Sequence, residues 1–206
     1  MSGVVVAGGV SKRFGEMKGL AKLNGKPLIL HVLDRLNPII DDVVVVVSSE
    51  RQRKEFGKIV TEKARIAIDK RQIQSPTVGA LTGFENVQSA YALLLGCDTP
   101  FLSTEILSFL LEICENRSAT IPRWPNGNIE PLHAVYKTEA GAKAAREALK
   151  QRKFDMRSMI ANLPNVRYVS TLVLRQLDPK LETFFNINTL NDLKAAETFG
   201  RKNKYA

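Results

Sequence analysis

The stretch GVVVAGGVSKRFG, residues 3–15, decides the fold because it joins an apolar strand to a glycine-rich turn. The run Gly3–Val6 predicts a first strand, and the pair Gly8-Gly9 follows it after one residue. Adjacent glycines let a backbone turn tightly and bring its N–H groups against an anion. Arg13 and Lys18 add positive charge beside the same turn. The stretch therefore predicts a phosphate-binding loop at the carboxyl end of the first strand.

Two common nucleotide motifs fit this loop poorly. No Ser or Thr follows Lys18 as a P-loop requires, and the adjacent Gly8 and Gly9 do not match the dinucleotide pattern G-x-G-x-x-G. An ordinary strand-to-helix turn with solvated basic residues is the alternative interpretation. The position at the end of the first strand favours phosphate binding.

Apolar runs of strand length alternate with amphipathic segments through the first half of the chain. This rhythm predicts a doubly wound α/β fold, with a mostly parallel sheet and helices on both faces. Strands are expected at Gly3–Val6, Val43–Ser48, Arg65–Ile68 and Tyr91–Cys97, and helices at Pro27–Leu36, Glu50–Ile59, Val78–Val87 and Thr104–Cys114.

The pattern changes from Asn116 onward. Shorter strands are expected here, with one clear helix, at the edge of the sheet and as a cap over the site; the strands are Ala119–Pro122, Ile129–Tyr136 and Val166–Val169, and the helix is Thr138–Arg152. Trp124 stands in a turn-rich loop, where a loop anchor is the favoured interpretation. The length predicts one domain over residues 1–206, with a nucleotide-binding part (1–115) and a substrate-side part with a closing helix (116–206).

Composition limits the function classes without choosing among them. The sequence is 44% hydrophobic and 25% charged, which is typical of a folded globular protein. A net charge of +9 predicts anionic partners but does not distinguish nucleotides, nucleic acids and acidic lipids. Cys97 and Cys114 lack the spacing of a metal site, so buried packing is expected. With no long apolar run and no nucleic-acid module, we expect a cytoplasmic protein with no membrane or nucleic-acid partner.

Asp98 ends the strongest apolar strand, at the edge where open α/β sheets gather ligands. A carboxylate there can hold Mg²⁺, which takes most of its other ligands from water and substrate phosphates. An Asx turn beside Pro100 is the alternative. The glycine loop on the same sheet favours the metal, so Asp98 is the expected Mg²⁺ ligand.

Two further groups are candidates for the substrate side of the site. Asn186 and Asn188 alternate with apolar residues, which would put both amides on one face of a short strand. Asn188 could instead be the cap of the last helix, and the residues alone favour that alternative. Arg157 is a candidate clamp for a planar anionic substrate, with a solvated helix end equally open.

Taken together, these motifs resemble the molybdenum cofactor guanylyltransferases. The resemblance extends over most of the chain and keeps the order of the motifs. It rests on the opening glycine loop with Lys18, on NGKPLI (24–29), VGALTG (78–83) and CDTPF (97–101), and on EPLHAVY (130–136) and FNINT (185–189).

The resemblance implies an activity and a set of site residues. Enzymes of this family transfer GMP from GTP to the terminal phosphate of molybdopterin and release pyrophosphate. It implies a Rossmann-like, glycosyltransferase-A-like nucleotidyltransferase fold, Mg²⁺ as cofactor, and GTP and molybdopterin as partners; proteins that deliver or accept the cofactor are further possible partners. The implied nucleotide-binding residues are Val6, Ala7, Gly8, Gly9, Lys18, Asp69 and Asp98, and the expected catalytic residues are Lys18, Asp98 and, from its charge and position, Arg13.

Several alternatives stay open. Ser48-Ser49 follows the second strand where some family members present an asparagine to the nucleotide, so guanine is implied less firmly than the reaction. A molybdopterin cytidylyltransferase or a guanylyltransferase for a cobalamin-precursor phosphate would keep the fold and change the substrate. A GTP-binding accessory protein without turnover and a nucleic-acid-binding protein are rivals from other classes, and the charge alone motivates the last.

Overall fold

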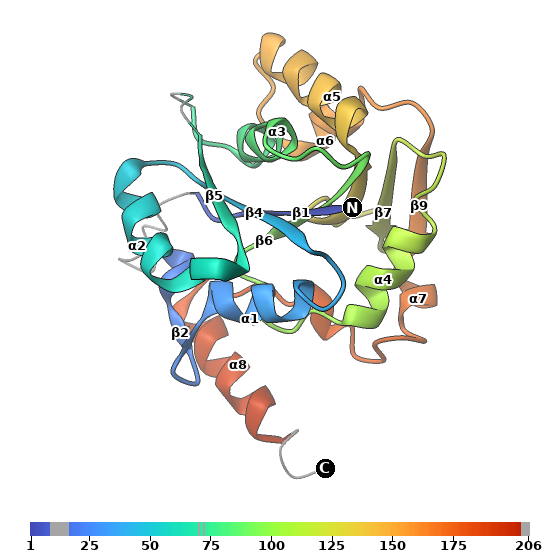
Figure 1. The fold of residues 1–206 in the computed structure, drawn as a ribbon. Helices are drawn as coiled ribbons and strands as arrows, with labels where there is room; N and C mark the ends of the chain where they lie inside the picture. The colour runs from blue at the N-terminus through green and yellow to red at the C-terminus, as the bar shows by residue number, and fades with distance from the viewer. Residues whose placement is uncertain (9–16, 70, 72, 203–206) are drawn as a thin grey trace.

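A computed structural model describes residues 1–8, 17–69, 71 and 73–202, with the backbone alone for 199–202. Their central feature is a seven-stranded sheet in the order β5-β4-β1-β6-β8-β7-β9 (Figure 1). Its strands are β1 (Ser2–Val6), β4 (Asp42–Val47), β5 (Arg65–Ile68), β6 (Tyr91–Gly96), β7 (Ala119–Arg123), β8 (His133–Lys137) and β9 (Val166–Ser170).

Every strand of this sheet except β8 points the same way. β1 pairs in parallel with β4 and β6, and Val6 stands opposite both Val46 and Gly96. β8 is antiparallel to β6 and to β7, so β7 and β9 return to the common direction. The predicted doubly wound α/β fold with a mostly parallel sheet is confirmed.

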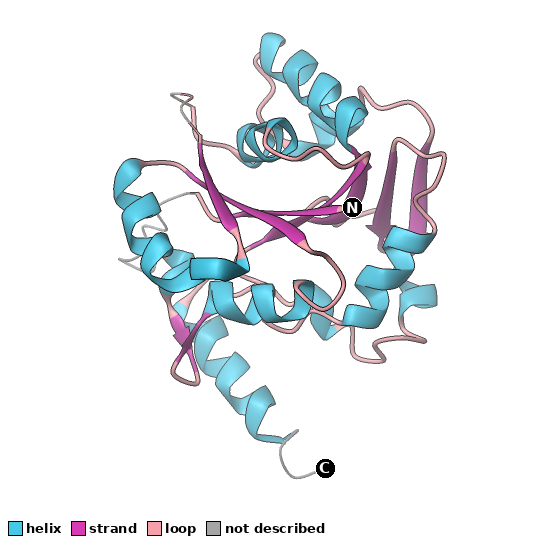
Figure 2. Ribbon diagram, in the orientation of Figure 1, coloured by secondary structure: helices cyan, strands magenta, loops and turns pink. Residues whose placement is uncertain are grey.

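Helices cover the sheet on both faces (Figure 2). Strand side chains alternate between the two layers: Val5, Val45 and Leu95 join the core beneath the first helix layer, and Val4 and Leu94 join the core beneath the second. The first layer holds α1 (Leu28–Leu36), α2 (Glu50–Val60), α4 (Thr104–Glu112) and α7 (Thr171–Leu174), and the second holds α3 (Pro76–Glu85), α5 (Thr138–Lys150) and α6 (Met156–Ile160).

The last helix, α8 (Leu190–Lys202), extends from the first-layer side of the molecule toward the C-terminus (Figure 1). It packs through Ala196 on a small core with Leu23, Leu28 and Ile187. Leu23 belongs to a hairpin of β2 (Lys22–Leu23) and β3 (Lys26–Pro27) that the sequence analysis did not predict. Its turn, Asn24-Gly25, has φ angles of 49° and 81°, as an Asn-Gly hairpin requires.

Two strand predictions in the second half are wrong. The expected strand 129–136 is shorter, because Pro131 lacks an N–H for the ladder and the His133 N–H bonds the Glu130 carbonyl in a turn. Residues 185–188 are not in a strand, so Asn186 and Asn188 do not share a strand face. Instead a short 3₁₀ helix, η3 (Glu182–Phe184), precedes them.

The Trp124 loop behaves as an anchor, as predicted. Its indole N–H donates to a Glu130 carboxylate oxygen at 2.7 Å, and its ring packs edge-on against Phe184 at 5.7 Å.

Within the described ranges, no helix combines the length and apolar character that crossing a bilayer requires.

Helix α3 lies unusually close to the central strand. A Cβ placed on Gly83 would stand 2.1 Å from Val4 Cγ1, and one on Gly79 would stand 2.7 Å from Val6 Cγ1. Only glycine fits at these positions without moving the helix off β1. Because α3 also begins at the carboxyl edge of the sheet, its seating on β1 fixes one wall of the site.

We expect Gly83→Ala to lower the free energy of unfolding by about 1–3 kcal/mol, the usual cost of overpacking a core. Gly57→Ala in α2 is the matched control, because its added Cβ would lie 3.9 Å from Ile66 Cδ1, an ordinary contact. That change should stabilise the protein by about 0.5–1 kcal/mol through helix propensity. Urea unfolding of both variants measures the difference, and equal stabilities would contradict the close packing of α3.

Candidate active site

A cavity of about 600 Å³ lies along the carboxyl edge of the parallel strands. Its floor is made by the ends of four strands: Gly8 after β1, Ser48 after β4, Asp69 after β5 and Asp98 after β6. The chain runs outward from β1 to β4 and β5 and then crosses to β6 on the other side. The cavity therefore lies at the topological switch point, where open α/β sheets bind ligands.

Asp98 stands where β6 ends. A Cβ on Gly96 would be 2.5 Å from its Oδ1, so the absence of a side chain at Gly96 makes room for the carboxylate over the strand end. The Asp98 carbonyl accepts a hydrogen bond from the Ile187 N–H at 2.9 Å. This bond ties the C-terminal segment to the strand end, and the carboxylate accepts a charged hydrogen bond from the Lys18 ammonium.

Lys18 begins a short 3₁₀ helix, η1 (Lys18–Leu20). Its side chain lies beside Asp98, although the two residues are far apart in the chain. Its ammonium also donates to Asn188 Oδ1 at 2.7 Å. The Lys18 and Asp98 side chains are 18% and 17% exposed, so water screens this pair only in part. The structure thus brings together three of the predicted residues, from positions far apart in the chain.

Asn188 is not the cap of the last helix, contrary to the favoured alternative. Thr189 caps α8 instead, because its hydroxyl accepts from the Asp192 N–H at 3.1 Å. The Asp192 carboxylate in turn accepts from the N–H groups of Asn188 and Thr189, at 2.9 and 2.8 Å. This capping box holds the Asn188 backbone and leaves its side chain to face Lys18.

Asp69 is the second carboxylate on the cavity wall and is 7% exposed. Its Oδ1 accepts from the Arg71 N–H at 3.0 Å and from the Thr82 hydroxyl at 3.3 Å. The Asp69 N–H bonds the Val47 carbonyl at 2.7 Å, which continues the β4–β5 pairing by one residue. The carboxylate is therefore fixed in direction, as a group that must recognise a ligand needs to be.

The start of α3 forms a wall of the cavity that was not predicted from the sequence. Gln74, Ser75 and Pro76 line it, and the Ser75 hydroxyl caps the helix by accepting from the Val78 N–H at 3.2 Å. A helix N-terminus favours anions, so this wall complements a phosphate-bearing ligand. The pair Ser75-Pro76 is a helix-start signal that could have moved the predicted start of this helix from Val78.

Other predicted residues lie elsewhere. Asn186 does not line the cavity, and its amide donates to the Phe184 carbonyl at 3.1 Å. Arg157 lines a separate cavity of about 330 Å³ and donates to Asn128 Oδ1 at 3.2 Å. Gly9 and Arg13 fall outside the residues that the structure describes, whereas Val6, Ala7 and Gly8 line the main cavity.

Burial dominates the environment of the histidines and cysteines. Burial lowers the pKa of His133 to about 4, and its ring packs edge-on against Phe184. Burial also lowers the pKa of His31, whose Nε2 lies 3.2 Å from the Leu23 carbonyl oxygen. Cys97 and Cys114 are buried free thiols, as predicted, and burial raises the pKa of Cys97 to about 12.

The donor set around Asp98 fits a magnesium ion. Among the residues with described side chains, no three His, Cys, Asp or Glu groups gather into a self-sufficient metal site. Mg²⁺ does not need one, because it is commonly held by one or two carboxylates together with substrate phosphates and waters. Asp98 supplies one carboxylate, and the Asn188 amide oxygen lies on the same side of the cavity.

Comparison with known proteins matches residues 3–166 to the MobA-like NTP transferase domain. A probable molybdenum cofactor guanylyltransferase of Pyrococcus horikoshii is 36% identical over 92% of this chain and 95% of its own length. One of Natronomonas pharaonis is 31% identical over 95% of this chain and 96% of its own length.

Solved structures agree with this comparison. The molybdopterin-guanine dinucleotide biosynthesis protein A of Archaeoglobus fulgidus superposes with a TM-score of 0.84 at 29% identity, over 98% of this chain and all (100%) of that protein. The 2-C-methyl-D-erythritol 4-phosphate cytidylyltransferase of Thermus thermophilus shares the fold, with a TM-score of 0.68 at 16% identity over 96% of this chain and 98% of its own. The chain therefore belongs to the family of MobA-like NTP transferase domains.

Proposed function

We propose that this protein transfers GMP from GTP to the terminal phosphate of molybdopterin, giving the guanine dinucleotide form of the cofactor and pyrophosphate. One observation carries the proposal: Lys18, Asp98 and Asn188 converge at the end of a cavity that begins at the glycine turn of β1. The names and full-length match of the relatives supply the substrate class.

We place the nucleotide along the floor of the cavity. The four strand ends that form this floor all belong to the predicted nucleotide-binding part, residues 1–115. The backbone of Val6, Ala7 and Gly8 would contact the nucleotide, and Gly9 stays a prediction for the same contact. A Cβ on Gly8 would lie 3.3 Å from the Ser48 backbone nitrogen, so glycine lets the two strand ends approach closely. Asp69, fixed by Arg71 and Thr82, would accept hydrogen bonds from the nucleoside.

We propose that Asp98 holds Mg²⁺ and that Lys18, with Arg13, neutralises the departing pyrophosphate. When bound, Mg²⁺ supplies positive charge that offsets the charge on the triphosphate. An acceptor phosphate is already ionised at neutral pH and can attack the α-phosphorus without a general base. This agrees with the two histidines, neither of which lines the cavity. We therefore expect this site to act by positioning the two substrates and by stabilising the charge on the reacting phosphates.

The acceptor side belongs to residues 116–206, where Leu132 and Asn188 line the cavity. Arg157 stays a prediction for the pterin end of the acceptor. It is exposed, and its neighbour in the smaller cavity, Arg123, lies 5.6 Å from the centre of the Tyr168 ring. These planar cations suit a planar anionic group.

The substrates that we propose, GTP and molybdopterin, agree with the cytoplasmic location that the sequence predicts.

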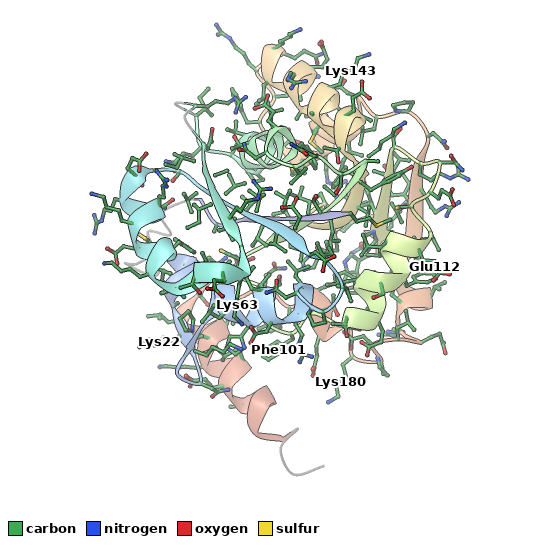
Figure 3. The ribbon with its side chains drawn as sticks, in the orientation of Figure 1. Lys22, Lys63, Phe101, Glu112, Lys143 and Lys180 are labelled. Atoms are coloured by element: carbon green, nitrogen blue, oxygen red, sulfur yellow. The ribbon has the colours of Figure 1, made fainter. Side chains whose placement is uncertain are left out.

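Calorimetric titration with GTP, CTP, ATP and UTP in the presence of Mg²⁺ tests the nucleotide site. We expect selective GTP binding that is lost in Lys18→Ala and Asp98→Asn. Lys22→Ala is the control, because this lysine is exposed and points away from the body of the molecule (Figure 3). Preference for CTP would support the cytidylyltransferase alternative, and no binding would contradict the nucleotide site.

A measurement of turnover distinguishes an enzyme from an accessory protein that binds GTP without converting it. Asp98→Asn should lower the rate of dinucleotide formation from GTP and molybdopterin by about 10²-fold or more, because it removes the carboxylate that we propose holds Mg²⁺ at the reacting phosphates. Asp41→Asn, which changes an exposed loop carboxylate, should keep the wild-type rate. Full activity in Asp98→Asn would rule out the metal role of this residue.

Arg157→Ala tests the acceptor side. We expect it to raise KM for molybdopterin several-fold and to leave KM for GTP unchanged, because Arg157 lies outside the nucleotide cavity. Steady-state kinetics with each substrate varied in turn make the comparison. Equal changes in both constants, or none, would remove Arg157 from the proposed acceptor contacts.

A further inference from the structure

The Lys18 ammonium occupies the position between two oxygen groups that a cation at this site would use. It donates to the Asp98 carboxylate and, at 2.7 Å, to Asn188 Oδ1. Carboxylate and amide oxygens are also the protein ligands that hard divalent cations prefer. The lysine is thus already bound to Asp98, the proposed Mg²⁺ ligand, and to an amide oxygen beside it.

The backbones that carry the two oxygen groups are held by hydrogen bonds, and both side chains are shorter than that of Lys18. The Ile187 N–H fixes the Asp98 carbonyl, and the Asp192 carboxylate holds the N–H groups of Asn188 and Thr189. Lys18 reaches them on a flexible four-carbon stem with three rotatable donors. The lysine therefore has more rotational freedom to leave this position than either oxygen group.

A divalent cation and the Lys18 ammonium cannot both stay beside Asp98 without a further anion. The Lys18 and Asp98 side chains are more than four-fifths buried, so repulsion between the two cations would be only partly screened. A nucleotide in the same cavity supplies that anion, because its phosphates offer oxygens to the lysine and to the metal at once. The cavity is lined by Lys18, Asp98 and Gly8 together, so the lysine can reach such phosphates by a side-chain rotation.

We propose that Lys18 holds the metal position closed until a nucleotide arrives, so that metal and nucleotide bind as a pair and the metal binds poorly alone. Asn188 is then a positioning residue, whose amide oxygen keeps the ammonium over Asp98 in the free protein. The inference rests on the proposed function for the identity of the nucleotide. By linkage, GTP and the metal strengthen each other's binding by the same factor.

Mn²⁺ is the probe, because its paramagnetic resonance signal reports free ion directly and it prefers the same oxygen ligands. The affinity for Mn²⁺ is measured without nucleotide in the wild type, Lys18→Met, Lys18→Gln and the control Lys22→Met. We expect Lys18→Met and Lys18→Gln to bind Mn²⁺ about 10-fold or more tightly than the wild type. Lys22→Met removes the same charge from an exposed side chain and should behave as the wild type.

Two further measurements complete the test. Asp98→Asn in the Lys18→Met background should abolish the gain, which assigns it to this carboxylate. Adding GTP should tighten Mn²⁺ binding about 10-fold or more in the wild type and much less in Lys18→Met. Equal Mn²⁺ affinities in the wild type and both Lys18 variants would overturn the inference, whether or not GTP binds. A wild type that binds no GTP would instead refute the proposed function, and the comparison without nucleotide would still decide the role of Lys18.

Discussion

The parallel pairing of β1 with both β4 and β6 is the constraint on which the site depends. Val6 stands opposite Val46 on one side and Gly96 on the other, so the three strands end at nearly the same level. The residues that follow, Gly8, Ser48 and Asp98, must then emerge side by side at one edge. A slip of one residue in either pairing would turn these side chains to the opposite face of the sheet.

The pairing holds because two layers of helices bury both faces of the sheet. The strands are almost continuously apolar, so neither face tolerates water, and each layer supplies a core of its own. The close seating of α3 on β1 has a direct consequence for function. It puts the capped start of that helix at the cavity, where the N–H groups of its first turn favour a phosphate-bearing ligand.

The three polar side chains that meet in the site come from distant segments of the chain, and each backbone is positioned by a different local feature. Asp98 is placed by the end of β6, Asn188 by the capping box of α8, and Lys18 by η1. Of these features, only the contact among the three side chains depends on the whole fold. It joins the first 20 residues to the last 20, so the three side chains meet only when the C-terminal segment is in place.

The sequence predicted most strands of the main sheet, the fold class and the position of Asp98 at a strand end, because these follow from local periodicity. It did not predict the pairing of Lys18 with Asp98 and Asn188, which depends on side-chain proximity between segments 80 and 170 residues apart. Asn188 shows the limit clearly: the residues alone favoured it as the helix cap, whereas in the structure Thr189 caps the helix and the Asn188 side chain faces Lys18. The missed hairpin at Asn24-Gly25 had a recognisable signal, whereas the position of Arg157 outside the cavity had none.

If this cavity binds GTP as proposed, the acceptor attacks the α-phosphorus. GTP radiolabelled separately at the α- and γ-phosphorus, with molybdopterin and Mg²⁺ present, tests this directly. We expect the α label in the dinucleotide product and the γ label in pyrophosphate, in equal amounts. Transfer of the γ label to the acceptor, or release of the α label as GDP, would contradict the proposal.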